Sequence, residues 1–321
     1  MNAAHDLSVM EKRKKRFKDR KDGYYVYDLD SMHKFMPYLL PDRADNEAVL
    51  KARFDMTKAM EYLAAKNSVP SEDGFKYTIF HLFLAAIAKT VYLRPLLNRF
   101  IQGRRVYDRK FMSFCFIVKK KFCDGSNEAV AIMKLGEDKS LSPIEEVHDK
   151  IHDIVYDIRV KNKTDSTTGV LDKLTKLPRF LLKFVTWCLT TMDYFGIMPE
   201  SLMKDDPYYT TVFLTNLGSI KMDADYHHLA NYGTNSIFAI VGEMKKRPFF
   251  NDDGTYEMKQ SVDLGMTIDE RIADGVYFAK SIKVLQKIIE NPELLDRPYD
   301  EEVEVGDVCG KPAFSDLSKA E

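Results

Sequence analysis

The first candidate for a reactive site in this sequence is a polar turn set between a strand and a helix. Residues 261–268 alternate apolar side chains with smaller or polar ones, which is typical of a strand with one buried face. The turn Asp269–Gly275 follows, and it carries the charged side chains of Asp269, Glu270, Arg271 and Asp274. A helix to about Glu290 is predicted next, ending before Pro292. Enzymes often place reactive groups on loops that rigid elements hold in this way.

Histidines supply two further candidates. His148 and His152 lie four residues apart, so a helix would place them on one face. A metal site needs three or four convergent ligands, and we therefore predict no metal here and interpret the pair as solvated. His227 and His228 adjoin acidic residues in a loop, and either a general base or ordinary loop residues fit that pattern.

Other common catalytic motifs are missing from the sequence. It contains no nucleotide-binding glycine pattern, P-loop, Gly-x-Ser-x-Gly elbow or His-Glu-x-x-His, so phosphoryl transfer and serine or zinc hydrolysis lack their usual motifs. The cysteines show neither paired zinc spacing nor disulfide density; they are Cys115, Cys123, Cys188 and Cys309. Such cysteines fit a reducing compartment, and the first ten residues do not resemble a secretory signal, so we expect a cytoplasmic protein.

Composition points to a globular protein with a sizeable core. Hydrophobic residues make up 45% and charged residues 30% of the 321 residues. Lys plus Arg number 48 against 49 Asp plus Glu, a formal net charge of −1, so no overall field attracts nucleic acid or an anionic membrane. We therefore expect no nucleic-acid partner.

The two ends of the chain carry opposite charge. Residues 11–22 hold eight basic and three acidic side chains, and residues 296–321 hold three basic and eight acidic ones. Either both are solvated tails, or each docks on the opposite end of a neighbouring subunit. Because the interior has no repeat or Pro/Gly/Ser-rich linker, we predict a basic N-terminal extension (1–22), one domain (23–298) and an acidic C-terminal tail (299–321).

The most apolar segment is Leu177–Met198. It contains Arg179, Lys183 and Asp193, and no uninterrupted apolar run approaches the roughly 20 residues of a membrane-spanning helix, so no transmembrane segment is predicted. A buried helix, a subunit contact and a membrane-surface helix all remain open.

Periodicity predicts a mixed sheet covered by helices rather than a doubly wound fold. The capping-box sequence Ser142–Glu145 begins an amphipathic helix, and Thr57 can cap a helix through about Lys66. Residues 78–91 are apolar enough for a core helix. Strands are predicted over residues 106–107, 112–119, 129–135, 210–215 and 236–242, the second and third joined by the turn Cys123–Ser126 as a hairpin.

Two motifs in order carry a family resemblance. The segment Asp269–Gly275 reads DERIADG and the segment Thr215–Gly218 reads TNLG, and they resemble the Asp-His-Arg-x-x-Asp-Gly and Ser-Asn-Leu-Gly motifs of the 2-oxoacid dehydrogenase acyltransferase (dihydrolipoamide acyltransferase) catalytic domain. Phe54–Thr57, Arg94–Asn98 and Lys246–Pro248 are similar to further family segments in the same order. More distantly, the chain resembles chloramphenicol acetyltransferase.

The resemblance implies a chloramphenicol acetyltransferase-like two-layer α/β fold and acyl transfer between coenzyme A and a small-molecule acceptor. It implies a homotrimer with active sites between subunits, and no metal. Thr215 stands on the hydroxyl position that stabilises the oxyanion. The resemblance implies that further residues support the structure of the site: Asn216, Gly218, Arg271, Asp274 and Gly275. We interpret Asp274 as structural. Since the predicted domain begins near Gly23, we expect a free-standing catalytic domain without lipoyl and subunit-binding domains.

The family's catalytic histidine is replaced by Glu270. A glutamate ordinarily titrates about two units below a histidine and is a weaker base unless burial raises its pKa. Three functions follow. The first is a coenzyme A-dependent acyltransferase with Glu270 as base and Thr215 as oxyanion donor. The second is an inactive trimeric scaffold or binding protein. The third is another enzyme that uses His227 or His228.

Overall fold

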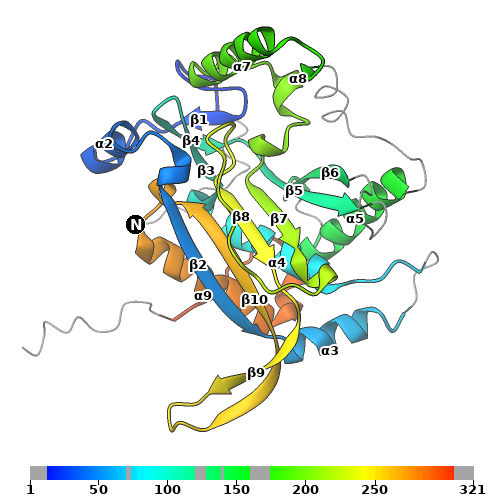
Figure 1. Ribbon diagram of the computed structural model, residues 1–321. Coiled ribbons are helices and arrows are strands. Elements are labelled where there is room, and N and C mark those ends of the chain that lie inside the picture. The colour runs from blue at the N-terminus through cyan, green and yellow to red at the C-terminus, as the bar shows by residue number, and fades with distance from the viewer. Residues whose placement is uncertain (1–12, 70–73, 120–127, 139–140, 160–173, 307–321) are drawn as a thin grey trace, which may run out of the picture.

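A computed structural model describes residues 13–69, 74–119, 128–138, 141–159 and 174–306, and its centre is a mixed seven-stranded sheet (Figure 1). Its strands, in spatial order, are β2 (Glu47–Asp55), β10 (Tyr256–Asp269), β8 (Ile237–Val241), β7 (Val212–Asn216), β5 (Met112–Lys119) and β6 (Glu128–Leu135), with β9 (Lys245–Phe250) paired to β10. The β8–β7 and β7–β5 pairs are parallel and the others antiparallel. A smaller sheet has the order β1 (Gly23–Tyr25), β4 (Arg105–Arg109), β3 (Arg99–Gln102).

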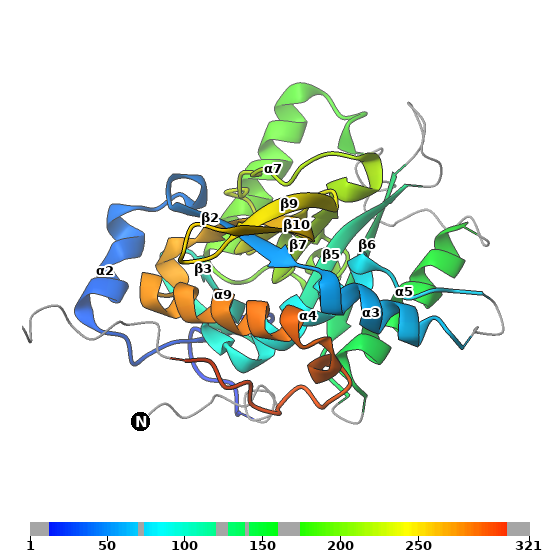
Figure 2. The same ribbon diagram turned by 90° about the horizontal axis from the view of Figure 1, so that it is seen from below.

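Helices cover one face of the large sheet (Figure 2). They are α3 (Thr57–Lys66), α4 (Ile79–Leu93), α5 (Pro143–Arg159) and α9 (Gly275–Glu290). The predicted mixed sheet covered by helices is therefore confirmed, as are the β5–β6 pair and the four predicted helices. The predicted turn Cys123–Ser126 lies outside the described residues.

The N-terminal caps of α3 and α4 add detail that the sequence analysis did not predict. α3 begins at Thr57, but its first N–H is capped by the carboxylate of Asp55, at 2.9 Å, and not by the Thr57 hydroxyl. α4 is buried over twelve consecutive residues, and Thr78 and His81 form a capping box at its start. A helix with this burial must lie within the core rather than on its surface.

A loop crosses the opposite face of the sheet because two glycines leave room for it. A Cβ atom on Gly242 would lie 2.4 Å from the Ala224 nitrogen, and one on Gly265 would lie 2.2 Å from the Asp225 oxygen. No side chain fits in so short a distance. The loop that carries His227 and His228 therefore lies directly over β8 and β10.

The apolar segment around residues 177–198 folds as α7 (Arg179–Tyr194), followed by α8 (Glu200–Met203). Phe180 is 76% exposed, Phe184 57% and Trp187 61%, so this face is not buried within the single chain, and a subunit contact or a membrane-surface helix remains as the alternative. Helical spacing places these aromatic side chains on one face. Asp193, near the other end of α7, is buried against Arg20 at 2.7 Å. Among the described residues, no helix is long and apolar enough to cross a membrane.

Packing continues past both predicted domain boundaries. Arg20 is buried and ion-paired with Asp22 and Asp193, both at 2.7 Å. Tyr299 is buried, and its hydroxyl donates to Glu146 Oε2 at 2.7 Å. The packed body thus includes residues on either side of 23–298. Docking of the charged ends on a neighbour stays a prediction, because residues 1–12 and 307–321 lie outside the described part of the chain.

Candidate active site

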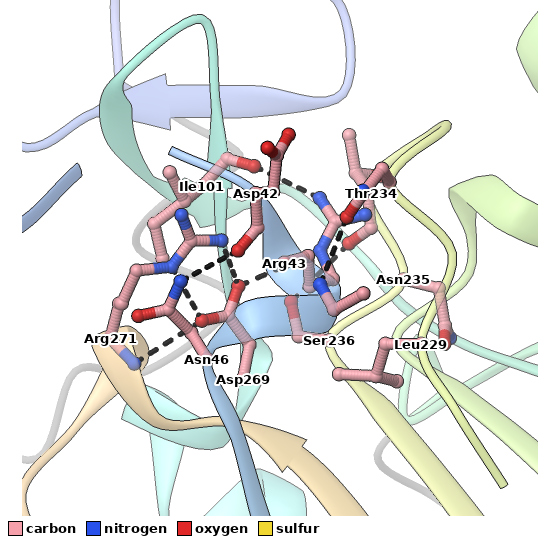
Figure 3. Close-up of polar contacts among 12 residues, drawn as sticks. Asp42, Arg43, Asn46, Ile101, Leu229, Thr234, Asn235, Ser236, Asp269 and Arg271 are labelled. Atoms are coloured by element: carbon pink, nitrogen blue, oxygen red, sulfur yellow. Dashed lines mark hydrogen bonds and ion pairs between the residues drawn. The ribbon is translucent and has the colours of Figure 1, made fainter. Parts of the chain in front are cut away.

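The polar turn predicted from the sequence is held by a buried ion-pair network (Figure 3). Asp269 is fully buried, and its two carboxylate oxygens accept from Arg271 Nε at 2.8 Å and Nη2 at 2.7 Å. Nε of Arg43 lies 3.5 Å from the same carboxylate. A bidentate pair of this kind fixes orientation as well as charge. It locks the short helical turn η5 (Glu270–Ile272) at the end of β10.

Both arginines tie this turn to distant loops. Nη1 of Arg271 donates to the carbonyl oxygens of Leu40 at 2.8 Å and Pro41 at 3.1 Å, in the loop after α2 (Ser31–Leu39). The Arg43 guanidinium donates to backbone carbonyls of Ile101, Ala230 and Gly233. Sequence reasoning missed Arg43, because a single arginine in a loop carries no periodic or motif signal.

Glu270 differs from its neighbours in this turn. Its backbone N–H donates to the Asn46 carbonyl at 2.9 Å, which fixes its main chain. Its side chain is exposed and makes no hydrogen bond or ion pair within the described residues. The dry, buried position that would strengthen a glutamate base is therefore not present in the single chain. The carboxylate is instead left open to a ligand or a partner.

Asp274 caps the helix that follows the turn. Its side chain accepts from the Tyr277 backbone N–H at 2.7 Å, and α9 begins at the next residue, Gly275. The space where a Gly275 Cβ would lie is open, so packing within this chain does not require glycine there.

We expect Asp274→Ala to lower the free energy of unfolding by about 1 kcal/mol, the usual cost of a lost N-cap. Urea unfolding measures this loss. Asp274→Asn retains a capping oxygen and should stay within a few tenths of a kcal/mol of the wild type. Equal losses in both variants would show that Asp274 does more than cap α9.

A pocket of about 470 Å³ opens beside Glu270. Its polar lining consists of Glu270, Arg271 and Asp274 together with His33 from α2. The remaining lining is apolar and comes from α2, β2, α9 and the turn before α9: Met32, Met36, Ala48, Leu50, Ala273, Phe278, Ala279 and Ile282, with Gly275. A concave, mostly apolar site with a few convergent polar groups is typical of small-molecule binding.

His33 is the pocket residue that sequence reasoning missed. Its Nδ1 lies 2.5 Å from Oδ2 of Asp30. Asp30 also accepts from the backbone N–H groups of Met32 and His33, as the N-cap of α2. The sequence holds a weak signal for this arrangement, an Asp at a helix start followed three residues later by a His.

The second motif lies at the other end of the sheet. Thr215 and Asn216 are the last residues of β7, and Thr215 pairs with Ile240 of β8. Gly218 follows in a tight turn, where a Cβ atom would lie 2.6 Å from the Gly242 oxygen. The glycine of this motif is therefore required by close packing of two backbones.

One chain does not bring Thr215 and Glu270 together. The backbone N–H of Asp269, the residue before Glu270, donates to the carbonyl of Ser236, which directly precedes β8. Thr215 lies on the next strand, β7, and is level with Ile240 near the other end of β8. From strand rise and spacing, their Cα atoms are about 16 Å apart or more. The two motifs lie at opposite ends of the sheet (Figure 1).

His227 is on the same face of the sheet as Thr215. Its ring stacks on Phe238 with a centroid distance of 4.2 Å, and Phe238 stacks on Phe213, two residues before Thr215. His228 stacks on His227 at 4.5 Å. Both histidines are exposed, and neither lines the pocket of Glu270.

The sequence indicated that the other histidine pair, His148 and His152, is solvated. The structure shows instead that both rings pack against aromatic side chains. His148 stacks on Tyr77 with ring centroids 4.0 Å apart, and its side chain is largely buried. His152 packs edge-on against Phe75. No metal-binding group of three or more His, Cys, Asp or Glu residues occurs in the part of the chain that the structure covers.

Known proteins are similar to the part of the chain that contains these two motifs. Residues 199–296 match the family model of the 2-oxoacid dehydrogenases acyltransferase (catalytic domain), a segment that includes both motifs. In this segment the chain is similar to the 2-oxoacid dehydrogenase acyltransferases. It is 21% identical over 239 residues to the lipoamide acyltransferase component of the branched-chain alpha-keto acid dehydrogenase complex of Bacillus subtilis. That match covers 74% of this chain and 45% of the relative, so the chain spans about half of the relative's length.

Solved acyltransferase structures share the fold. A probable dihydrolipoamide acetyltransferase from Listeria monocytogenes has a TM-score of 0.53 at 18% identity, over 84% of this chain and 95% of the other. A chloramphenicol acetyltransferase has a TM-score of 0.52 at 11% identity, over 83% and 99%. The predicted chloramphenicol acetyltransferase-like fold is thereby confirmed.

Proposed function

We propose that this relative of the acyltransferases transfers acyl groups from coenzyme A thioesters to a small-molecule acceptor, as a homotrimer. One observation carries the proposal: the two family motifs form well-held half-sites, yet a single chain keeps them apart. A neighbouring copy can bring its Thr215 to the pocket that holds Glu270. Assembly into a trimer then completes each active site from two chains.

The residues of the half-sites fit the chemistry of acyl transfer. The acceptor's hydroxyl, thiol or amine attacks the carbonyl carbon of the thioester, and the open carboxylate of Glu270 takes the proton. Negative charge develops on the carbonyl oxygen, where the Thr215 hydroxyl of the neighbouring copy donates a hydrogen bond. The apolar lining of the pocket accommodates an uncharged acyl chain or the thiol-bearing arm of coenzyme A.

A further solved neighbour supports this choice of residues. The dihydrolipoamide acetyltransferase of Azotobacter vinelandii has a TM-score of 0.52 at 13% identity, over 84% of this chain and 94% of the other. In that protein a serine, a histidine and an asparagine have been investigated for their role in the catalytic mechanism. The histidine and asparagine are four residues apart, as are Glu270 and Asp274 here. The departure from histidine is the feature that favours the alternative, an inactive trimeric scaffold that retains ligand binding.

Thiol release from acetyl-coenzyme A tests the proposal. With dihydrolipoamide, small amines and alcohols as acceptors, we expect wild-type turnover by a species of three times 37.1 kDa in light scattering. Saturable binding of acetyl-coenzyme A without turnover across the panel would select the scaffold. A stable, active monomer at micromolar concentration would contradict the shared site.

A further inference from the structure

The Asp30–His33 pair lies at the pocket of Glu270 but outside both family motifs. One carboxylate performs two tasks: it caps α2 through the N–H groups of Met32 at 2.9 Å and His33 at 3.1 Å, and it bonds the His33 ring at 2.5 Å. The same residue that starts the helix therefore fixes the orientation of the histidine. Such a carboxylate behind a histidine is a recurring device for setting the tautomer of the ring.

The geometry assigns the two ring nitrogens different roles. Nδ1 is engaged by Asp30, so Nε2 is the nitrogen left for a ligand, and within the described residues it has no partner. The backbone N–H of His33, together with the ring, holds the pKa of Asp30 below its usual range, so the carboxylate stays charged. The side chains of His33 and Asp30 are 40% and 61% exposed, so the ring is accessible to a ligand.

The other charged groups around the pocket are already engaged. Arg271 is paired with Asp269 and bonded to the loop after α2, and Asp274 caps α9. Arg104, from the turn before β4, lies over Tyr38 at the far end of α2. Of the described residues that line the pocket, the Glu270 carboxylate and His33 Nε2 thus remain for a ligand. The Glu270 carboxylate can accept a proton, and an imidazole can donate one from Nε2.

We propose that His33, fixed by Asp30, is the general acid of the Glu270 pocket and protonates the sulfur atom of coenzyme A as it leaves. This inference rests on the acyl transfer proposed above. It gives the chain a replacement for the single histidine that would otherwise serve as both base and acid. The two tasks are divided between a carboxylate on one wall and an imidazolium on the other.

The proposed step balances in protons and electrons. The acceptor atom forms a bond to the carbonyl carbon, its proton passes to Glu270, and the carbonyl π electrons move to oxygen. When the oxyanion collapses, the carbon–sulfur bond breaks and its electron pair goes to sulfur, which takes the proton from His33 Nε2. Glu270 is then protonated and His33 neutral. Transfer of one proton from Glu270 to His33, directly or through water, restores the starting state.

The test compares leaving groups in His33→Asn, whose amide retains a donor toward Asp30. With acetyl-coenzyme A we expect kcat to fall by about 10²-fold and the alkaline limb of the pH profile to disappear. With 4-nitrophenyl thioacetate, whose acidic thiol leaves without a proton, the loss should be less than about threefold. Asp30→Asn still caps α2 but removes the carboxylate that fixes the ring, so kcat with acetyl-coenzyme A should also fall.

His152→Asn is the matched control, since His152 is similarly exposed and lies 3.6 Å from Asp153, away from the pocket. It should leave both pH limbs in place. Equal losses of His33→Asn with both donors, or an unchanged alkaline limb, would overturn the role of His33 while leaving acyl transfer intact. No turnover by the wild type with any acceptor would overturn both proposals. Urea unfolding of each variant separates misfolding from lost chemistry.

Discussion

Trimers of Glu270→Gln chains and trimers of Thr215→Val chains are each expected to lose about 10²- to 10⁴-fold in acyl transfer, while a mixture of the two regains activity. The reason is the separation of Glu270 and Thr215 in one chain. In a mixed trimer, one interface can combine the intact Glu270 of one copy with the intact Thr215 of the next. Random assembly of equal amounts makes about one quarter of the interfaces complete.

The measurement is thiol release after the two variants are unfolded together, refolded and separated by size. Each variant refolded alone is the control, and Glu61→Gln, an exposed glutamate on α3, should behave as the wild type. If the two residues act within one chain, every mixed trimer contains only damaged sites and remains inactive. That result would end the proposal of a shared site even if the wild type turns over.

Replacing Asp269 by Asn should lower the free energy of unfolding by about 3–5 kcal/mol, because it leaves buried charge without a partner. The carboxylate of Asp269 has no exposed surface, and the side chains of Arg271 and Arg43 are 1% and 2% exposed. Asparagine has the same shape, so lost packing does not account for the effect. The two guanidinium groups keep their backbone acceptors but lose the charge that compensated their desolvation.

Urea unfolding measures the loss, and Glu301→Gln serves as the comparison. Glu301 is paired with Arg297 at 2.6 Å, but both side chains are about half exposed, so its loss should cost less than about 1 kcal/mol. Similar values for the two variants would mean that water reaches Asp269 in solution.

Most secondary structure was predictable from the sequence because it depends on local pattern. The helix α5 follows from its capping box and apolar spacing, and β5, β6 and β10 follow from their apolar residues and the turns that bound them. The strands β1, β2, β3 and β9 were not predicted; β1 and β3 have only three or four residues, which carry too little periodicity. The sequence left open whether the apolar face of α7 is buried, and the structure exposes it in the single chain. Hydrophobicity alone does not distinguish a core helix from one whose apolar face binds another molecule.

The candidate site was only partly predictable. The two motifs identified Glu270 and Thr215, but strand order decides that they lie at opposite ends of the sheet. That order depends on pairing between distant segments, which no local pattern contains. Similarly, His33 lies about 240 positions from Glu270 along the chain, and only the packing of α2 beside β2 and α9 brings it to the same pocket.

The pairing of β2 with β10 also determines when this chain can fold during synthesis. Ala48 lies opposite Ile268, and within the described residues β2 has no other strand partner. A nascent chain therefore carries β2 unpaired while more than two hundred further residues are translated. Over that interval α4 is covered only in part, by elements such as α5 and β5, while α9 is still to be made. Closure of the sheet must wait for residues 256–269 to leave the ribosome, and such delayed long-range pairing is the situation in which molecular chaperones protect growing chains from aggregation.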